Sequence, residues 1–289
     1  MLIHVIIATT GRAEIAAAAV ERLASQTRLA DGIVVIGAHP ADVADVADRN
    51  PAADVLIAPR GSCSQRNAGL DHIAGRSDVA VFFDDDLVAD HDYLARVEQL
   101  FGADPELVGL TGHLVADGAH TGAIRWDDAV ARLDRMGERI DAPSTETTWL
   151  YGCNMAVRLS AAVDLRFDTA LPFYGWQEDV DFSARLGRQG RMMRVPQLTG
   201  IHLGVRGGRT SGRRFGYSQV ANVFYLRRKG TIRLIHGWRL MLGNIAANLV
   251  RSIRPEPEID RRGRLRGNIL ALADILRGRV DPRRIETFP

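Results

Sequence analysis

Residues 78–88 read DVAVFFDDDLV, in which five consecutive apolar residues, Val79 to Phe83, run directly into three aspartates. A short apolar run rich in β-branched and aromatic residues predicts a strand that is buried on both faces, as in a parallel sheet. The carboxyl end of that strand would carry Asp84, Asp85 and Asp86. Because open α/β sheets bind their ligands at the carboxyl ends of their strands, this stretch predicts both a fold class and the position of a site.

Three adjacent carboxylates repel one another unless a cation lies among them. Mg²⁺ in proteins commonly binds one or two carboxylates together with the phosphates of a substrate. We therefore hypothesise a site for a divalent cation and a diphosphate at this strand end. The alternative is a solvated acidic loop in which an aspartate caps the following helix.

The composition of the 289 residues is ordinary for a globular protein, with 46% hydrophobic and 25% charged residues. Cys63 and Cys153 form no zinc-type spacing, so a reducing compartment is a simpler interpretation than one disulfide. The N-terminus lacks the features of a signal peptide. No apolar run approaches the ~20 residues that span a bilayer. We therefore expect a cytoplasmic protein.

Charge is unevenly distributed, although the net charge is only +2. From Gly200 onward there are 19 Lys and Arg residues against 6 Asp and Glu residues, so the remainder of the chain is acidic. Such asymmetry is typical of proteins that contact phosphates, nucleic acid or an anionic membrane surface. A solvated arginine-rich helical surface explains it equally well.

Strands alternate with helices through the first half of the chain, which predicts βαβ units and a parallel sheet. The expected strands are residues 2–8, 33–37, 54–58, 79–83 and 107–115. The expected helices are an alanine-rich one ending near Gln26 and residues 40–47, 62–74, 93–101 and 177–189. Residues 147–157 are expected to be a strand, or a loop that leads into a strand through Gly152. Residues 192–195 and 198–203 complete the predicted body, and residues 117–143 receive no assignment.

The C-terminal part of the chain is predicted to be a basic loop followed by two helices. The loop covers residues 207–214, and the helices cover residues 231–253 and 260–277. Apolar residues recur at helical spacing in the first of these helices, with Arg233 and Arg251 on the opposite side. That face would pack on the body, form a dimer or lie on an acidic membrane. We expect the domains to be 1–205 and 206–289.

Two common classes of nucleotide or cofactor site are disfavoured by the lysine and glycine content. Lys229 is the single lysine, so there is no Gly-Lys-Ser/Thr P-loop. A pyridoxal phosphate enzyme would need this lysine for its Schiff base. No GxGxxG motif follows the first strand, which weakens a dinucleotide-binding interpretation.

Two polar segments follow other predicted strands. Thr9–Arg12 offers hydroxyls, backbone amides and a guanidinium for a base or phosphate, or forms an ordinary capped turn. Gln65–Leu70 contains Arg66, which suits bidentate neutralisation of phosphate, or is a surface arginine of a helix. Both segments would reach the predicted phosphate site only if the sheet brings them to the same edge.

Two further features lie downstream. Tyr174–Phe182 combines aromatic residues with acids at a helix start, where Asp179 would stay ionised as a general base must. Acids also favour a first helical turn for purely structural reasons. His202 follows an apolar strand and is either a structural hydrogen bonder or a metal ligand suited to Mn²⁺.

Taken in order, these segments resemble the family 2 glycosyltransferases of the GT-A fold, over residues 1 to about 230. The matching segments are Thr9–Arg12, Gln65–Leu70, Asp84–Asp86, Tyr151–Ala156 and Trp176–Asp179, and the segment from His202 to Arg228 is also similar. The resemblance implies a Rossmann-like, mostly parallel sheet with flanking helices and a C-terminal helical extension. It also implies metal-dependent, inverting transfer of a sugar, of the hexosyltransferase type, from a nucleotide diphosphate donor.

The resemblance assigns roles to individual residues. Asp84, Asp86 and His202 match metal ligands for Mn²⁺ or Mg²⁺, and Asp179 matches the general base with Glu178 beside it. The residues implied for the donor nucleotide are Thr9, Thr10, Arg12, Gly37, Arg60, Gln65, Arg66, Asp84 and Asp85. Those implied for the sugar and acceptor are Tyr151, Gly152, Asn154 and Trp176. Arg206, Arg209 and Arg213 are candidates for stabilising the diphosphate.

One departure and several open choices accompany the resemblance. Many relatives carry an aspartate pair after the second strand to bind the base, whereas this chain has Gly37–Pro40 there. The implied partners are a nucleotide diphosphate sugar and a saccharide, lipid-linked or small-molecule acceptor, without nucleic acid. Peripheral contact with the inner face of the membrane and a homodimer are further expectations.

Two competing functions come from other classes. A sugar-nucleotide pyrophosphorylase shares an α/β nucleotide sheet, but it generally uses a longer glycine-rich loop and a lysine after the first strand. A non-enzymatic nucleic-acid-binding protein would use the basic C-terminal region with strong salt dependence. That alternative leaves the acidic residues of both Asp84–Asp86 and Glu178–Asp179 without a purpose.

Overall fold

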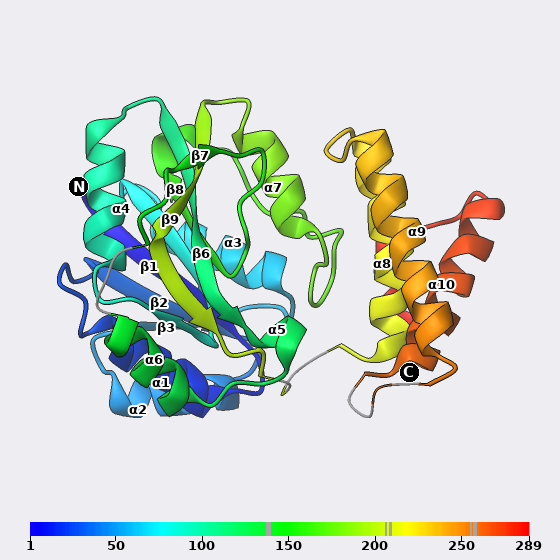
Figure 1. Ribbon diagram of the computed structural model, residues 1–289, viewed down its shortest axis with the longest axis horizontal. Helices are drawn as coiled ribbons and strands as arrows, with labels where there is room; N and C mark the ends of the chain where they lie inside the picture. The colour runs from blue at the N-terminus through cyan, green and yellow to red at the C-terminus, as the bar shows by residue number, and fades with distance from the viewer. Residues whose placement is uncertain (137–139, 206, 208–209, 255, 257–258, 289) are drawn as a thin grey trace. The chain divides into compact units, whose positions relative to one another are not determined.

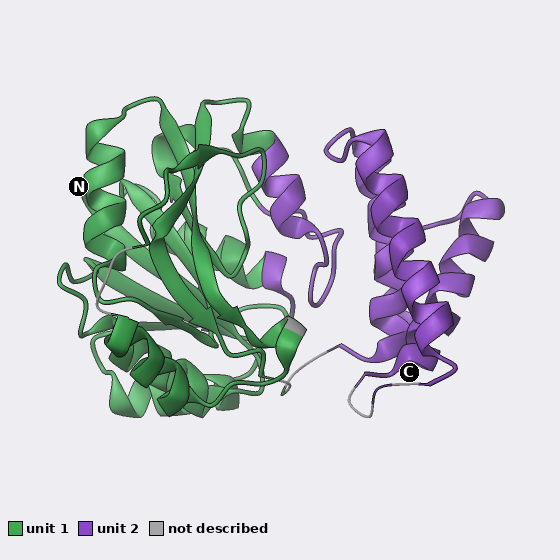
Figure 2. Ribbon diagram, viewed as in Figure 1, with its two compact units in different colours: residues 1–60, 64–166, 185–208 green, residues 61–63, 167–184, 209–289 purple. Residues whose placement is uncertain are grey.

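The computed structural model describes residues 1–136, 140–205, 207, 210–254, 256 and 259–288. The chain forms two compact units (Figure 2), each made from segments that are separate in the sequence. Unit 1 comprises residues 1–60, 64–166 and 185–208, and unit 2 comprises residues 61–63, 167–184 and 209–289. Among the described residues, no helix has both the length and the apolar character needed to cross a membrane.

Unit 1 is built on one mixed β-sheet with the strand order β3-β2-β1-β4-β8-β6-β9-β5, and β7 pairs with β9 (Figure 1). The strands are β1 (Ile3–Thr9), β2 (Gly32–Gly37), β3 (Asp54–Ile57), β4 (Val79–Asp84), β5 (Leu87–Ala89), β6 (Leu107–Asp117), β7 (Thr145–Glu146), β8 (Asn154–Arg158) and β9 (Arg191–His202). Strands β1 to β4 are parallel, as predicted. Strand β8 is antiparallel to both β4 and β6, and β6 is parallel to β9.

This topology brings several strand ends to one edge of the sheet. Because β8 is antiparallel to both of its neighbours, β4 and β6, strands β1, β4, β6 and β9 all run in the same direction. Their carboxyl ends carry Thr9, Asp84, Asp117 and His202, respectively. The sheet order therefore gathers at one edge residues that are up to two hundred positions apart in the chain.

Helices cover the sheet of unit 1. They are α1 (Ala13–Leu23), α2 (Ala44–Arg49), α3 (Ser62–His72, which starts in unit 2), α4 (Tyr93–Ala103), α5 (Gly118–Thr121) and α6 (Trp126–Met136). Helix α7 (Glu178–Leu186) belongs mostly to unit 2. Short 3₁₀ turns occur at Pro40–Asp42 and Leu159–Ala161. The predicted helix at residues 40–47 is thus a turn followed by α2.

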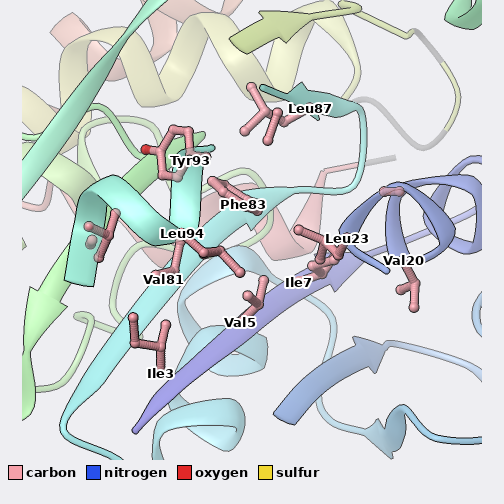
Figure 3. Close-up of a cluster of buried hydrophobic side chains, with 14 of the residues drawn as sticks. Ile3, Val5, Ile7, Val20, Leu23, Val81, Phe83, Leu87, Tyr93 and Leu94 are labelled. Atoms are coloured by element: carbon pink, nitrogen blue, oxygen red, sulfur yellow. The ribbon is translucent and has the colours of Figure 1, made fainter. Parts of the chain in front are cut away.

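One hydrophobic cluster of unit 1 lies on the face of the sheet that α1 and α4 cover. Alternate residues of β1 and β4 point toward α1 and α4, and the side chains of this cluster are shown in Figure 3. Val79 to Phe83 are all buried, which confirms the predicted two-sided burial of that strand. On the other face α3 packs closely, because a Cβ at Gly69 would lie 2.6 Å from Ile6 Cγ2.

Unit 2 contains α8 (Gly212–Lys229), α9 (Leu234–Arg251), α10 (Arg261–Leu276) and a 3₁₀ turn at Pro282–Thr287. Its core includes Tyr217, Val220, Met241, Ala271 and Phe288. Helices α8 and α10 touch through glycines, since a Cβ on Gly267 would overlap the backbone of α8. Because glycine has no side chain, the two helix backbones can approach closely at Gly267.

The sequence-based assignments differ from the structure at several further places. Helix α8 begins at Gly212, inside the expected basic loop of residues 207–214, and continues through residues that received no assignment. The side chain of Ser211 caps its start by accepting a hydrogen bond from the Arg214 backbone N–H. Helix α6 lies in the segment that received no assignment. The two segments predicted at residues 192–195 and 198–203 belong to the single strand β9. Propensity is a weak guide where packing stabilises the element instead.

Candidate functional site

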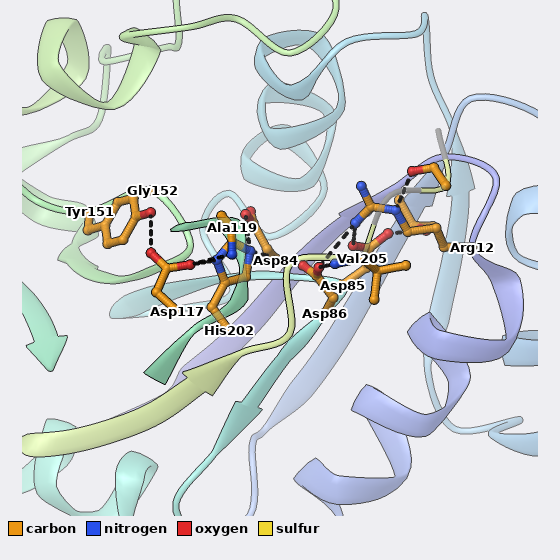
Figure 4. A network of polar contacts seen from close by, with 12 residues as sticks. Arg12, Asp84, Asp85, Asp86, Asp117, Ala119, Tyr151, Gly152, His202 and Val205 are labelled. Carbon is orange, nitrogen blue, oxygen red and sulfur yellow. Dashed lines mark hydrogen bonds and ion pairs between the residues drawn. The ribbon is translucent and has the colours of Figure 1, made fainter. Parts of the chain in front are cut away.

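Two carboxylates and one imidazole converge at the carboxyl edge of the unit 1 sheet (Figure 4). Asp84 ends β4, Asp86 lies in the turn between β4 and β5, and His202 ends β9. One possible ligand atom from each of them lies within 4.8 Å of the others. Oxygen and imidazole nitrogen donors of this kind suit Mn²⁺, and carboxylates also suit Mg²⁺.

The His202 ring is oriented by a second carboxylate. Its Nδ1 lies 2.9 Å from Asp117 Oδ1, and the Tyr151 hydroxyl donates a 3.1 Å hydrogen bond to Asp117 Oδ2 (Figure 4). Its Nε2 therefore faces the aspartates, 3.2 Å from Asp86 Oδ1 and 3.8 Å from Asp84 Oδ2. A carboxylate behind a histidine is the usual support for a metal-binding imidazole.

Asp86 supplies the strongest sign that the ligand atoms fit a cation. Its Oδ2 accepts a 2.7 Å hydrogen bond from the Val205 backbone N–H. Its Oδ1 is buried without a hydrogen bond of good geometry among the described residues, despite the nearby His202 ring. A buried carboxylate oxygen in this state is costly, so the residues present fit a metal ion at this point.

The electrostatics of the ion-free site show the same need for positive charge. Burial lowers the pKa of His202, but the hydrogen bond to Asp117 and the close contacts with the charged Asp86 and Asp84 outweigh it and raise the pKa to about 10. Burial also opposes ionisation of Asp86, yet the contact with His202 and the charge of Arg12 leave its pKa below the ordinary value. The imidazolium therefore takes the position of a cation between the carboxylates.

Asp85 points away from this group and toward β1. The Thr9 hydroxyl donates a 2.7 Å hydrogen bond to Asp85 Oδ2, and Arg12 forms a 2.7 Å ion pair with Asp85 Oδ1. Burial and the charge of Asp86 raise the pKa of Asp85 to about 7, against the opposing effects of Arg12 and Thr9. Arg12 also lies 3.6 Å from Asp86 Oδ2, so it links the two aspartates.

Two residues of the Gln65–Leu70 segment have defined contacts in unit 1. The Gln65 amide donates 2.7 Å hydrogen bonds to the backbone oxygens of Thr9 and Ile36, which holds the ends of β1 and β2 together. Arg66 donates 2.9 Å hydrogen bonds to Asp84 Oδ1 and to the Gly152 oxygen. Arg66 therefore joins the metal-ligand group to the loop that precedes β8.

The other predicted residues of unit 1 lie around the same strand ends or behind them. Thr10 directly follows β1, and Gly37 is the last residue of β2. Arg60 is exposed in the loop after β3. Asn154 is fully buried in β8, where its Oδ1 accepts a 3.2 Å hydrogen bond from Thr111.

Trp176, Glu178 and Asp179 belong to unit 2 and lie at or just before the start of α7. Glu178 and Asp179 lie in the first turn of α7 and are largely buried. The residue before them, Gln177, has a left-handed φ of 75°, which is uncommon for a residue other than glycine. The Trp176 backbone oxygen accepts a 2.9 Å hydrogen bond from Asn222 of α8, which anchors this loop.

Of the three predicted diphosphate-binding arginines, only Arg213 belongs to the described residues. Arg206 and Arg209 lie outside them. The Arg213 guanidinium lies over the Phe288 ring of unit 2, 4.7 Å from its centroid. This stacking gives Arg213 a packing role within its own unit.

Asp117 is the site residue that sequence reasoning missed. The strand predicted at residues 107–115 was correct in position but two residues short of its observed end. An aspartate at the carboxyl end of a strand parallel to β4 was the available signal. This signal could not identify Asp117 without the strand order, because sequence alone does not reveal that β6 and β9 are neighbours.

The comparisons with known proteins support the fold. No protein-family model matches the chain, and no curated protein does. Among solved structures, the mannosyltransferase PcManGT from Pyrobaculum calidifontis, in complex with GDP-Man and Mn²⁺, is similar with a TM-score of 0.56 and 16% identity, over 98% of this chain and 84% of that one.

Two structures of S. aureus TarS are also similar. For residues 1–349 of TarS, the TM-score is 0.58 with 12% identity, over 99% of this chain and 82% of that one. For a longer TarS structure the TM-score is 0.53 with 13% identity, over 88% of this chain and 44% of that one. Together with the sheet described above, these likenesses show that the chain has a GT-A type α/β fold, as the sequence predicted.

Proposed function

We propose that this protein is an inverting family 2 glycosyltransferase that moves a sugar from a nucleotide diphosphate sugar to an acceptor hydroxyl. The observation that carries the proposal is the group of Asp84, Asp86 and His202 at the carboxyl edge of a GT-A sheet. The likeness to a mannosyltransferase in complex with GDP-Man and Mn²⁺ supports a nucleotide sugar as donor and Mn²⁺ as cofactor. Mg²⁺ suits the same oxygen donors.

The proposed metal site uses Asp84 and Asp86 as a DxD motif, with His202 Nε2 as the third ligand. A bound divalent cation would stabilise the negative charge that grows on the departing diphosphate. Asp117 holds the His202 ring in position by a contact with the imidazole Nδ1. Arg66 holds Asp84 by a 2.9 Å hydrogen bond and limits the repulsion between the carboxylates.

The donor nucleotide is proposed to bind beside this group, at the ends of β1 to β3. The residues proposed for it are Thr9, Thr10, Arg12, Gly37, Arg60, Gln65, Arg66, Asp84 and Asp85. Within this set the hydrogen bonds of Gln65 to backbone oxygens indicate that it acts by fixing the strand ends. Arg12 and Thr9 similarly fix Asp85.

Asp179 is proposed as the general base that removes the proton of the acceptor hydroxyl. Its place in the first turn of α7 favours the carboxylate form, because the positive end of the helix dipole stabilises a negative charge. Glu178 lies beside it in the same turn. Tyr151, Gly152, Asn154 and Trp176 are proposed to shape the binding site of the sugar and acceptor, and Arg206, Arg209 and Arg213 to assist the diphosphate.

The proposed division of labour assigns catalysis to residues 1–205 and an accessory role to residues 206–289. The compact units differ from this division, because residues 167–184, with Asp179, belong to unit 2. The acceptor is proposed to be a saccharide, a lipid-linked group or a small molecule with a free hydroxyl.

The proposal is tested by metal-dependent donor binding. Nucleoside diphosphates and nucleotide sugars, with GDP-mannose first, are screened by thermal shift with and without Mn²⁺ or Mg²⁺. A ligand that binds only the folded state raises the melting temperature by mass action. Asp86→Asn should abolish the metal-dependent shift, whereas Asp127→Asn, at a side chain 85% exposed, should retain it.

The same screen identifies the donor for a transfer assay. Inversion predicts that proton NMR of the first product shows the anomeric configuration opposite to that of the donor. Absence of any metal-dependent shift across all donors, or an equal shift in Asp86→Asn, would contradict the proposed function.

A further inference from the structure

One side of α9 presents a continuous apolar surface. We call the apolar face of α9 the set of its apolar residues that are 47% to 67% exposed, namely Leu234, Ile235, Trp238, Leu242, Leu249 and Val250. At about 100° per residue these positions lie on one broad side of the helix. The neighbouring side of the helix contains the buried residues Gly237, Met241 and Asn248. The helix is therefore amphipathic, with much of its apolar surface outside the core of its own unit.

Such a surface needs an explanation because it is contiguous. Single exposed apolar residues are normal, whereas contiguous exposed patches mark interaction sites. Trp238 lies within the apolar face and is 48% exposed. Tryptophan is enriched at the boundary between water and lipid, where its ring and its N–H meet different surroundings.

The charge around the apolar face indicates which partner fits it. No Asp or Glu occurs anywhere from Phe182 to Pro255. The exposed arginines near α9 in the chain include Arg227, Arg228, Arg239 and Arg254, and Arg239 lies beside Ile235 on the helix. Arg251 instead forms a 3.0 Å ion pair with Glu256. Anionic phospholipids attract such basic segments. A symmetric dimer through the same surface would instead bring like charges together, since each copy contributes the same patch.

We propose that the apolar face of α9 binds the surface of an anionic phospholipid bilayer. The apolar side chains enter the boundary between headgroups and acyl chains, and the surrounding arginines contact lipid phosphates. The helix lies in the plane of the membrane and does not cross it. The inference is independent of sugar transfer, because vesicle binding requires no donor, no acceptor and no metal ion.

The test uses the full chain and two kinds of vesicle. One kind is pure phosphatidylcholine, and the other is phosphatidylcholine with a minor share of phosphatidylglycerol. Co-sedimentation should recover the protein with the anionic vesicles and leave it in solution with the neutral ones. Raising the ionic strength should weaken the binding, because salt screens the attraction between arginines and phosphates.

Substitutions then locate the binding surface. The double variant Trp238→Ser with Leu242→Ser removes two large apolar groups from the apolar face and should weaken partitioning by about tenfold or more. The matched control is Leu29→Ser with Val163→Ser, at two exposed apolar residues of unit 1 that are 60% and 68% exposed. The control should bind as the unaltered protein does. Circular dichroism checks that both variants keep their helices.

A conservative variant gives a second measurement that does not depend on a destabilising change. Trp238→Phe keeps an apolar ring and should still bind vesicles. Brominated lipid should quench tryptophan emission in the unaltered protein and quench it much less in Trp238→Phe. That difference would place Trp238 itself in the lipid.

Four results would overturn the inference. They are no recovery with anionic vesicles, equal binding to neutral vesicles, unchanged binding of the double serine variant, and equal quenching in Trp238→Phe. If the protein does not bind vesicles and sedimentation equilibrium shows a dimer that the double serine variant dissociates, the apolar face of α9 binds a second copy of the chain.

Discussion

The imidazole Nδ1 of His202 lies 2.9 Å from Asp117 Oδ1, although the two residues are 85 positions apart. Because a carboxylate only accepts hydrogen bonds, this contact requires the proton on Nδ1 and turns Nε2 toward Asp84 and Asp86. The ring is thereby prepared to bind a cation through Nε2. The relationship explains why an ordinary histidine at the end of a strand becomes part of a ligand group.

Loss of Asp117 should therefore weaken cation binding without removing a ligand. Asp117→Asn replaces the carboxylate with an amide that supports the His202 ring less strongly, and we expect Mn²⁺ affinity to fall by about 10- to 100-fold. Isothermal titration calorimetry with Mn²⁺ and a nucleoside diphosphate measures the change. Asp127→Asn is the control. An affinity equal to that of the unaltered protein would show that the contact with Asp117 is not needed.

Cation binding should release a proton at neutral pH. The pKa of His202 is raised to about 10 in the ion-free protein, so its ring is protonated at pH 7. An imidazole that binds a metal ion must first lose the proton from the binding nitrogen. Apparent Mn²⁺ affinity should therefore rise with pH up to about 10. Calorimetry in two buffers with different ionisation enthalpies counts the protons released. No proton release at pH 7 would contradict this assignment of His202.

The same raised pKa predicts how the stability of the ion-free protein changes with pH. A histidine whose folded pKa lies above its unfolded value of 6.5 stabilises the fold fully below that pH. This contribution should be lost as the pH rises from about 6.5 through 10. Urea unfolding of the metal-free protein across this range should show a steeper decline than that of His202→Gln. Parallel declines in the two proteins would refute it.

Lys229, the single lysine, should be important for the stability of unit 2. Its Nζ forms ion pairs with Asp168 Oδ2 at 2.5 Å and with Asp181 Oδ2 at 2.9 Å, and the Asp181 side chain is fully buried. Lys229→Met removes the cation between two carboxylates and should cost about 2–4 kcal/mol, since Lys229 itself is partly exposed. The urea midpoint measures this loss. Arg228→Met, at the exposed neighbouring residue, should have little effect.

A pH dependence should accompany this ion pair. Burial opposes ionisation of Asp168, but hydrogen bonds from Lys229, Ala170 and Tyr225 lower its pKa below the ordinary 3.8. Its stabilising contribution is therefore present above pH 3.8 and is lost as the pH falls through the folded pKa. The acid-induced loss of stability should be shallower in Lys229→Met. An identical acid slope in both proteins would argue against a role for the pair.

Asp179→Asn should reduce turnover far more than donor binding. Removing a general base typically lowers the rate by about 10²–10⁴-fold. We expect this loss in kcat with the donor identified by thermal shift, while the Kd for the donor stays within a small factor. Asp164→Asn, at an exposed aspartate in unit 1, serves as the control. Turnover at the unaltered rate would mean that another residue removes the proton.

The sequence was sufficient for the features that depend on local pattern. Val79 to Phe83 are apolar without interruption because β4 is covered on both faces, and the same five residues are buried in the structure. Asp84 and Asp86 follow directly in the chain, so their place at the strand end was determined with it. The order of motifs along residues 1 to about 230 then indicated the GT-A fold, which the solved structures support.

Only the tertiary structure decided how the strand ends are combined. The antiparallel strand β8 lies between β4 and β6, and this order brings Asp117 and His202 to the edge that carries Asp84. Hydrogen bonding between distant strands leaves no periodicity in a single sequence, so Asp117 could not be found from it. Tertiary packing also decides α8, a glycine-containing, arginine-rich helix whose approach to α10 requires Gly267. The pattern of apolar and polar residues along the chain predicts burial and turns. A site built from four strands depends instead on which strands become neighbours.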